Sequence, residues 1–235
     1  MRKLAQIITA LVLLLSLAGV LLWQFFAAEK INFYIICVAV LLLSMLPFII
    51  GFEVKKISAR EITLVATLIA LAVVSRAVFY LIPQFKPIAA VVVVSAVCLG
   101  AERGYVIGAF SAFISNFIFG QGYWTPFQMV ALGLVGLLSG LIFKFVKPNR
   151  YTMSAVGFIL SFVVYGLIVD TSSVLTMSAG EITLPGALVI YASGAPFSFI
   201  FGASTALFLF LFGDTFVKKI NRINTKFNLV ISKKN

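Results

Sequence analysis

Histidine is absent from this sequence of 235 residues, and acidic residues are scarce, with 7 Asp and Glu against 18 Lys and Arg. The lack of histidine excludes histidine metal sites and catalytic triads built on a Ser-His or Cys-His pair. The two cysteines, Cys37 and Cys98, lie in separate apolar runs, where small buried thiols are expected rather than a disulfide or metal site. We therefore expect no bound metal and no cofactor.

Charge of either sign is also rare, because charged residues make up 11% of the chain and hydrophobic residues 62%. A soluble domain has about a quarter of its residues charged, and a disordered chain has few apolar residues. Both classes are excluded. The apolar segments are continuous rather than alternating, which argues against a barrel. The composition predicts an all-α, polytopic membrane helical bundle.

Eight apolar segments have lengths near that of a membrane span. The first continues past the usual core of a signal peptide, which indicates an uncleaved span. The fourth is short for a span, and Pro83 and Pro87 precede it. The segments cover residues 4–28, 32–51, 60–82, 88–101, 104–120, 127–146, 151–170 and 186–213.

A charged stretch at residues 52–60 divides these segments into two groups. Residues 1–56 are expected to form a two-span hairpin with a cytoplasmic linker. Residues 57–220 are expected to form a six-span core, and residues 221–235 a basic cytoplasmic tail. The chain after Asp214 is basic and polar, which favours an amphipathic helix on anionic lipid over a frayed end.

The distribution of basic residues supports eight spans with both termini in the cytoplasm. In that threading only Lys30 and Lys86 fall outside, Arg76 falls within a span, and every other Lys and Arg lies on the cytoplasmic side. The net charge of +11 therefore reflects membrane topology, and we expect no nucleic-acid partner.

Two local patterns predict how the helices begin and pack. Ser58 and Glu61 have the spacing of a capping box, which predicts a helix start. Small residues four apart let helices approach closely, and packing within the bundle is the expected role of the glycine pairs. The small pairs are Ala66/Ala70, Gly104/Gly108 and Gly136/Gly140.

Arg76 is the most informative single residue, because it lies late in the third span, near its outer end. An arginine at the centre of a membrane helix costs about 2.5–3.5 kcal/mol on insertion scales. Its side chain is therefore expected to face a cavity, where it suits an anionic substrate group or a carboxylate such as Asp170. The alternative is a side chain that snorkels to the outer interface.

The predicted outer connections carry polar and aromatic side chains that suit a small-molecule site. Residues 119–128 combine flat rings with two amides, and Asn116 lies one turn before Gly120. Residues 79–87 and 171–185 are the other two outer connections of the core, the latter expected as a long loop. An ordinary aromatic belt at the interface is the alternative. The candidate substrate-binding residues are Arg76, Tyr80, Gln84, Asn116, Gln121, Tyr123, Trp124, Gln128 and Asp170.

Missing motifs narrow the function further. The sequence has no phosphate-binding loop of the G-x-x-x-x-G-K-[ST] type, so ATP hydrolysis must come from a partner. A self-sufficient secondary carrier or channel is an alternative, disfavoured by the scarcity of acids within the spans. A membrane enzyme would need a convergent nucleophile or acid–base pair, and the sequence offers none.

Residues 57–220 resemble the substrate-binding S component of an energy-coupling factor (ECF) vitamin importer, over about two-thirds of the chain. The resemblance rests on a six-span block after a charged lead-in, on Ala66-x-x-x-Ala70 at the start of that block, and on a longer run. That run is Lys86-Pro87, then Gly100-Ala101-Glu102-Arg103-Gly104, then Asn116-Phe117-Ile118-Phe119-Gly120-Gln121-Gly122-Tyr123-Trp124-Thr125-Pro126.

The resemblance implies a transport subunit of the bacterial cytoplasmic membrane without enzymatic activity. Such a subunit captures a vitamin outside and docks on a membrane T component coupled to two ATPases, with Ala66 and Ala70 on the docking face. A likeness to cobalamin-type members with extra N-terminal spans favours cobalamin. Riboflavin, thiamine, folate and queuosine precursors remain open. The hairpin at residues 1–51 departs from the six-span pattern.

Overall fold

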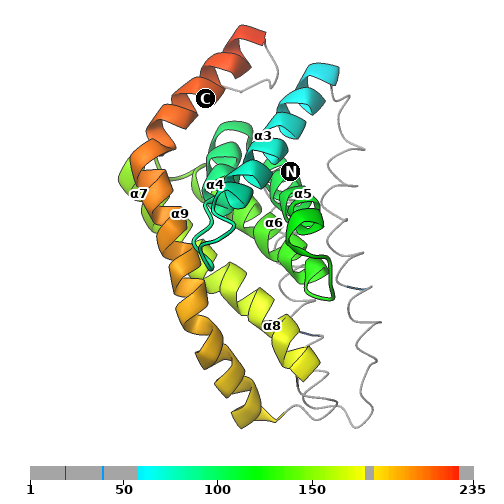
Figure 1. The fold of residues 1–235 in the computed structure, drawn as a ribbon. Helices are drawn as coiled ribbons and strands as arrows, with labels where there is room; N and C mark the ends of the chain where they lie inside the picture. Colours follow the sequence, from blue (N-terminus) through cyan, green and yellow to red (C-terminus); the bar gives the residue numbers. More distant parts are fainter. Residues whose placement is uncertain (1–18, 20–38, 40–57, 178–182, 228–235) are drawn as a thin grey trace.

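The computed structural model describes residues 58–177 and 183–227, together with the single residues 19 and 39. In the two longer ranges the chain forms six helices and no strand, which confirms the predicted all-α membrane bundle (Figure 1). One of the six helices consists of three consecutive segments, α7, η1 and α8. The predicted N-terminal hairpin lies outside the described residues. The elements are α3 (Ala59–Val78), α4 (Ile88–Leu99), α5 (Ala101–Phe119), α6 (Thr125–Ile142), α7 (Arg150–Ile159), η1 (Leu160–Tyr165), α8 (Gly166–Met177) and α9 (Leu184–Phe227).

Four helices of the described ranges are long and apolar enough to cross a bilayer. They are α3, α6, the continuous helix formed by α7, η1 and α8, and α9. The α4 helix has 12 residues, about 18 Å at 1.5 Å per residue, which is shorter than a hydrocarbon core of about 30 Å. The chain is a multi-pass membrane protein, and α4 by itself is too short to cross the bilayer.

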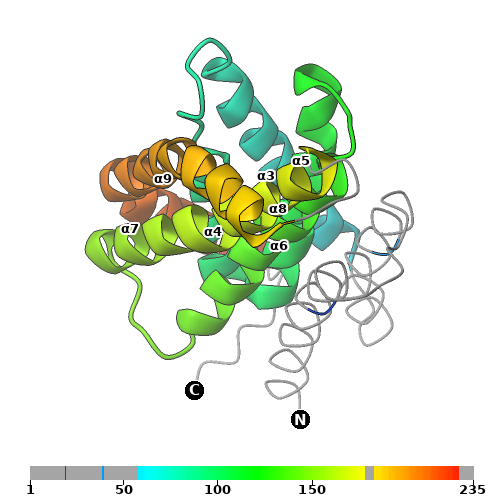
Figure 2. The same ribbon diagram turned by 90° about the horizontal axis from the view of Figure 1, so that it is seen from below.

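The α4, α5 and α6 helices pack against one another and form the centre of the bundle, where most apolar side chains of α6 are buried. The α7–η1–α8 helix packs along α9 on one side of this centre, as both views show (Figures 1 and 2). The α3 helix begins and α9 ends at the same end of the bundle, while α8 and the first half of α9 project beyond the other helices at the opposite end (Figure 1).

The start of α3 shows how the local sequence fixes a helix end. The Ser58 side chain accepts a hydrogen bond from the Glu61 backbone N–H at 3.2 Å, which confirms the predicted helix start. The Glu61 carboxylate does not close the capping box but accepts a hydrogen bond from Nε of Arg103 on α5. The predicted local pair is therefore replaced by an ion pair that ties α3 to α5.

The prediction of a long outer loop at residues 171–185 is wrong, because α8 continues to Met177. The hydroxyl groups of this stretch donate to backbone carbonyls of the preceding turn, as Thr171 does to Leu167 at 2.8 Å and Thr176 to Ser172 at 2.6 Å. The polar side chains that suggested a solvated loop are thus satisfied inside a helix.

The chain after Asp214 is also part of a longer helix than the sequence suggests. The α9 helix continues without interruption to Phe227, across the expected boundary at residue 220. Ile220 and Asn224 are buried in the bundle. The first part of the predicted surface helix is therefore the end of a core helix.

The glycine pairs pack α5 against α6, as predicted. A Cβ added at Gly104 would lie 2.8 Å from the carbonyl oxygen of Gly136, and one added at Gly136 would overlap the Gly104 carbonyl. A Cβ at Gly108 would overlap the backbone of Leu132. Backbone meets backbone here, so there is no flexible side chain that can move aside.

We expect Gly136→Val to lower the free energy of unfolding by about 1–3 kcal/mol, because the added methyl groups force α5 and α6 apart. The measurement is thermal unfolding of the purified protein in detergent. Ala192→Val, on the exposed face of α9, is the matched control for a β-branched residue in a helix. Equal melting temperatures for the two variants would contradict the close packing of α5 on α6.

Candidate functional site

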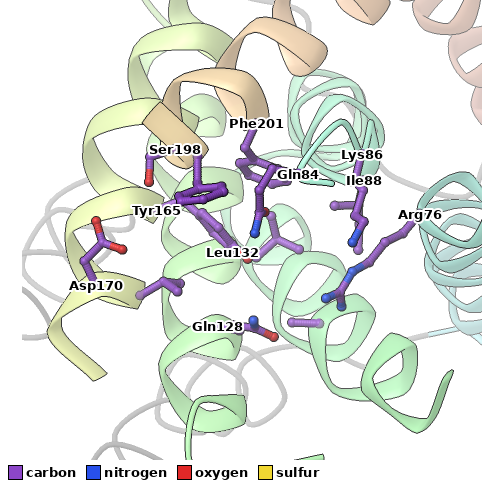
Figure 3. Close-up of a pocket in the computed structure, with 13 residues that line it drawn as sticks. Arg76, Gln84, Lys86, Ile88, Gln128, Leu132, Tyr165, Asp170, Ser198 and Phe201 are labelled. Atoms are coloured by element: carbon purple, nitrogen blue, oxygen red, sulfur yellow. The ribbon is translucent and has the colours of Figure 1, made fainter. Parts of the chain in front are cut away.

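One end of the bundle is hollowed by two adjoining chambers. The inner chamber has a volume of about 110 Å³ and the outer one about 330 Å³. Both are lined by Arg76, Lys86, Gln128 and Val169, so we treat them as one cavity. Figure 3 shows the inner chamber. The loops at residues 79–87 and 120–124 lie at this end, which the charge distribution predicts to be extracytoplasmic.

Arg76 lies in the last turn of α3 and points into the cavity (Figure 3). Its Nη1 donates hydrogen bonds to Oγ of Ser115 and, at 2.8 Å, to Oδ1 of Asn116. The guanidinium lies over the ring of Phe119, 4.2 Å from its centroid. The side chain therefore faces polar and aromatic partners on α5 rather than snorkelling away from the bundle.

Asn116 connects three helices around Arg76. It is 1% exposed, and its Nδ2 donates to Oγ1 of Thr125 at 3.1 Å and to Oε1 of Gln128 at 2.9 Å, both on α6. Thr125 in turn donates to Oε1 of Gln121 at 2.9 Å. The Asn116 amide thus uses its oxygen for α3 and its nitrogen for α6, which fixes the direction of the amide.

The α5–α6 loop holds two rings over the mouth of the cavity. Gly120 ends α5 with φ +98°, a conformation that residues with a Cβ rarely adopt. A Cβ added at Gly122 would lie 2.6 Å from the ring of Trp124, so only glycine lets the indole fold back over the loop. The Tyr123 and Trp124 rings meet edge to face at 4.8 Å.

Lys86 is a second cation of the cavity, on the loop between α3 and α4. Its Nζ lies 4.5 Å from the centroid of the Phe119 ring, and its backbone oxygen accepts a hydrogen bond from Oγ of Ser204 on α9 at 3.2 Å. Burial and the nearby positive charge of Arg76 lower the pKa of Lys86. The sequence places this lysine outside the spans but gives no reason to include it in the site.

The far wall of the cavity comes from η1 and α9. Tyr165 ends the π-helical segment η1, and its ring stacks on Phe201 at 4.4 Å. A π-helical turn carries more residues than an α-helical one and so changes the direction of the side chains that follow. Pro196 interrupts the hydrogen bonding of α9 shortly before Ser198, which also lines the inner chamber. Sequence periodicity contains no signal for this wall.

Seven of the nine candidate residues line the cavity, namely Arg76, Gln84, Asn116, Tyr123, Trp124, Gln128 and Asp170. Tyr80 lies outside it, 55% exposed, with its ring 5.0 Å from that of Phe119. Gln121 supports Thr125 and donates to the carbonyl of Phe113 at 3.0 Å. Substrate contact by any of the nine stays a prediction.

The lining combines flat rings, amides that both donate and accept hydrogen bonds, and charges of both signs. Asp170 lies across the cavity from Arg76 (Figure 3). Among the described residues no group of three acidic or cysteine side chains is arranged to hold a metal ion. The arrangement suits reversible capture of a heteroaromatic small molecule.

Comparison with known proteins gives one finding. The family model described as "ECF-type riboflavin transporter, S component" matches residues 56–212, which is more than half of the chain. No curated protein and no solved structure gives a significant match.

We expect Asn116→Leu to lower the free energy of unfolding by about 1–3 kcal/mol, because it removes one hydrogen-bond partner from each of Arg76, Thr125 and Gln128. Thermal unfolding in detergent measures the effect. Asn221→Leu, at an exposed position of α9, is the control with the same change of side chain. The structural role of Asn116 would be contradicted if the two variants unfolded at the same temperature.

Proposed function

The chain belongs to the family of ECF-type riboflavin transporter S components, and we propose that it captures a compact, planar vitamin of the riboflavin class in the cavity. The cavity end faces the outside of the cell, and the bound vitamin is handed to an ATP-driven module for import. The observation that carries the proposal is the cavity itself, a hollow with aromatic and amide walls inside the part of the chain that the family covers.

The chemistry of an isoalloxazine ring matches this lining. Its two apolar faces suit stacking against the indole of Trp124 or the phenol of Tyr165, since offset aromatic pairs are favourable beyond the area they bury. Its imide edge presents donors and acceptors in alternation. Gln84 and Gln128 carry the complementary pattern, because each amide donates and accepts at once.

The size of the cavity supports riboflavin over cobalamin, the vitamin favoured in the sequence analysis. Ligand pockets for drug-sized molecules have volumes of about 300–1,000 Å³, and the outer chamber, about 330 Å³, lies at the lower end. A corrin ring with its nucleotide loop is far larger than a flavin. Cobalamin is not supported by the family match either, which is to a riboflavin-type model.

The partners follow from the family, and one helix face suits them. Ala66 and Ala70 lie on the exposed side of α3, away from the cavity. The neighbouring hydroxyls turn back onto their own helix, with Thr63 donating to Ala59 at 3.0 Å and Thr67 to Thr63 at 2.8 Å. This leaves a patch of small side chains, bordered by the exposed Ile62 and Val74, against which a helix of the membrane T component packs, with the two ATPases bound to that component.

We expect riboflavin to bind the purified protein with a dissociation constant below the micromolar range. We expect Trp124→Ala and Gln128→Ala each to weaken binding about three- to tenfold, since each removes a stacking face or a hydrogen bond. Quenching of flavin fluorescence measures the affinity. Tyr151→Ala, an exposed aromatic at the start of α7, is the control. If micromolar riboflavin does not bind the wild-type protein, the proposal fails.

The double variant Ala66→Leu, Ala70→Leu is expected to keep vitamin binding and to abolish uptake, because bulky side chains separate α3 from the T component. The measurement is vitamin uptake by cells that express this chain with a T component and two ATPases. Ala192→Leu on α9 is the control for added bulk on a lipid-facing helix. Normal uptake by the double variant would place the docking face elsewhere, and uptake by this chain alone in liposomes would indicate a self-sufficient carrier.

A further inference from the structure

Two cations share one wall of the cavity. Arg76 comes from α3 and Lys86 from the following loop, and both lie over the Phe119 ring, at 4.2 and 4.5 Å from its centroid. Figure 3 shows them side by side, with Asp170 on the opposite wall. Among the described residues neither cavity cation lies within ion-pair distance of a carboxylate, unlike Arg103, which pairs with Glu61, and Arg150, which pairs with Asp214.

This arrangement is costly for an empty cavity. Like charges that line one cavity repel, and the partial burial of Lys86 beside Arg76 weakens the screening that water provides. The Phe119 ring offsets only part of the cost. An anion bound in the cavity that both cations line offsets the repulsion and accepts charge-assisted hydrogen bonds from them.

Arg76 also retains unused donors on the cavity side. Its hydrogen bonds to Ser115 and Asn116 both come from Nη1. Within the described residues Nε and Nη2 donate to no protein acceptor, although a guanidinium carries five N–H groups in a planar fork that matches carboxylate and phosphate oxygens. Asn116 fixes one end of the fork and leaves the rest available to a ligand.

From these contacts we infer that the ligand of the cavity carries an anionic group, a phosphate monoester or a carboxylate, that binds to Arg76 and Lys86 while its aromatic ring lies toward Tyr165 and Trp124. The inference rests on the proposed function and refines it. Among flavins, the phosphorylated form is the preferred ligand, and neutral riboflavin binds more weakly. An anionic lipid headgroup has the same chemistry, so the experiment must separate the two sources.

The test compares riboflavin with flavin mononucleotide, which differ only by the phosphate, on full-length protein in nanodiscs of phosphatidylcholine. We expect flavin mononucleotide to bind about tenfold more tightly, and this ratio to fall toward one in Lys86→Gln and at high salt. Lys147→Gln, an exposed lysine of the α6–α7 loop, should keep the ratio. Since Arg76 also supports the fold, the salt dependence of the wild-type protein provides a readout that needs no variant.

Equal or weaker binding of flavin mononucleotide overturns the inference but leaves the proposed function intact. If neither flavin binds, the proposed function fails. The anion-binding inference is then tested by comparing the thermal shifts given by thiamine and thiamine monophosphate, and by pyridoxal and pyridoxal phosphate. A larger shift with the phosphorylated member supports the inference, and equal shifts overturn it. If only nanodiscs with phosphatidylglycerol show a Lys86-dependent thermal shift, the anion is a lipid headgroup and the assignment to the ligand is wrong.

Discussion

An arginine within an apolar bundle needs polar partners, and the hydrogen bonds that Arg76 donates to Ser115 and Asn116 supply part of them. Asn116 also donates hydrogen bonds to Thr125 and Gln128, so its single amide holds α3, α5 and α6 in one relative position. The cavity wall depends on that position. Without Asn116, Arg76 would keep only Ser115 as a hydrogen-bond partner on α5, and Gln128 would lose the contact that directs its amide.

The bundle has a tightly packed centre and a hollow end, and both depend on glycine residues. Between α5 and α6, glycines remove side chains so that backbones touch and no space remains. At the α5–α6 loop, Gly120 and Gly122 instead permit backbone and ring positions that hold Trp124 over a hollow. The rigid centre keeps the walls apart, which is what lets a cavity persist in a protein of this size.

The sequence predicts those parts of the fold that depend on local or periodic signals. Continuous apolar runs indicate the helices, Ser58 marks the start of α3, and an arginine late in a span points to an inward-facing site. Residues 171–177 were misread because their hydroxyls suggest a loop, whereas backbone carbonyls within the helix satisfy them. Tyr165 and Lys86 could not be found, because a π-helical turn and the folding of a loop across a neighbouring ring depend on tertiary packing.

The length of α9 has a mechanical consequence. From Ser198 at the cavity to Phe227 the helix continues for about 45 Å at 1.5 Å per residue, well beyond what a bilayer requires. Pro196, which removes one backbone hydrogen bond, lies just before this arm. A small rotation there moves the distant basic end by an amount proportional to the length of the arm. The helix therefore links the cavity and the basic end of α9 mechanically, because both belong to one continuous element.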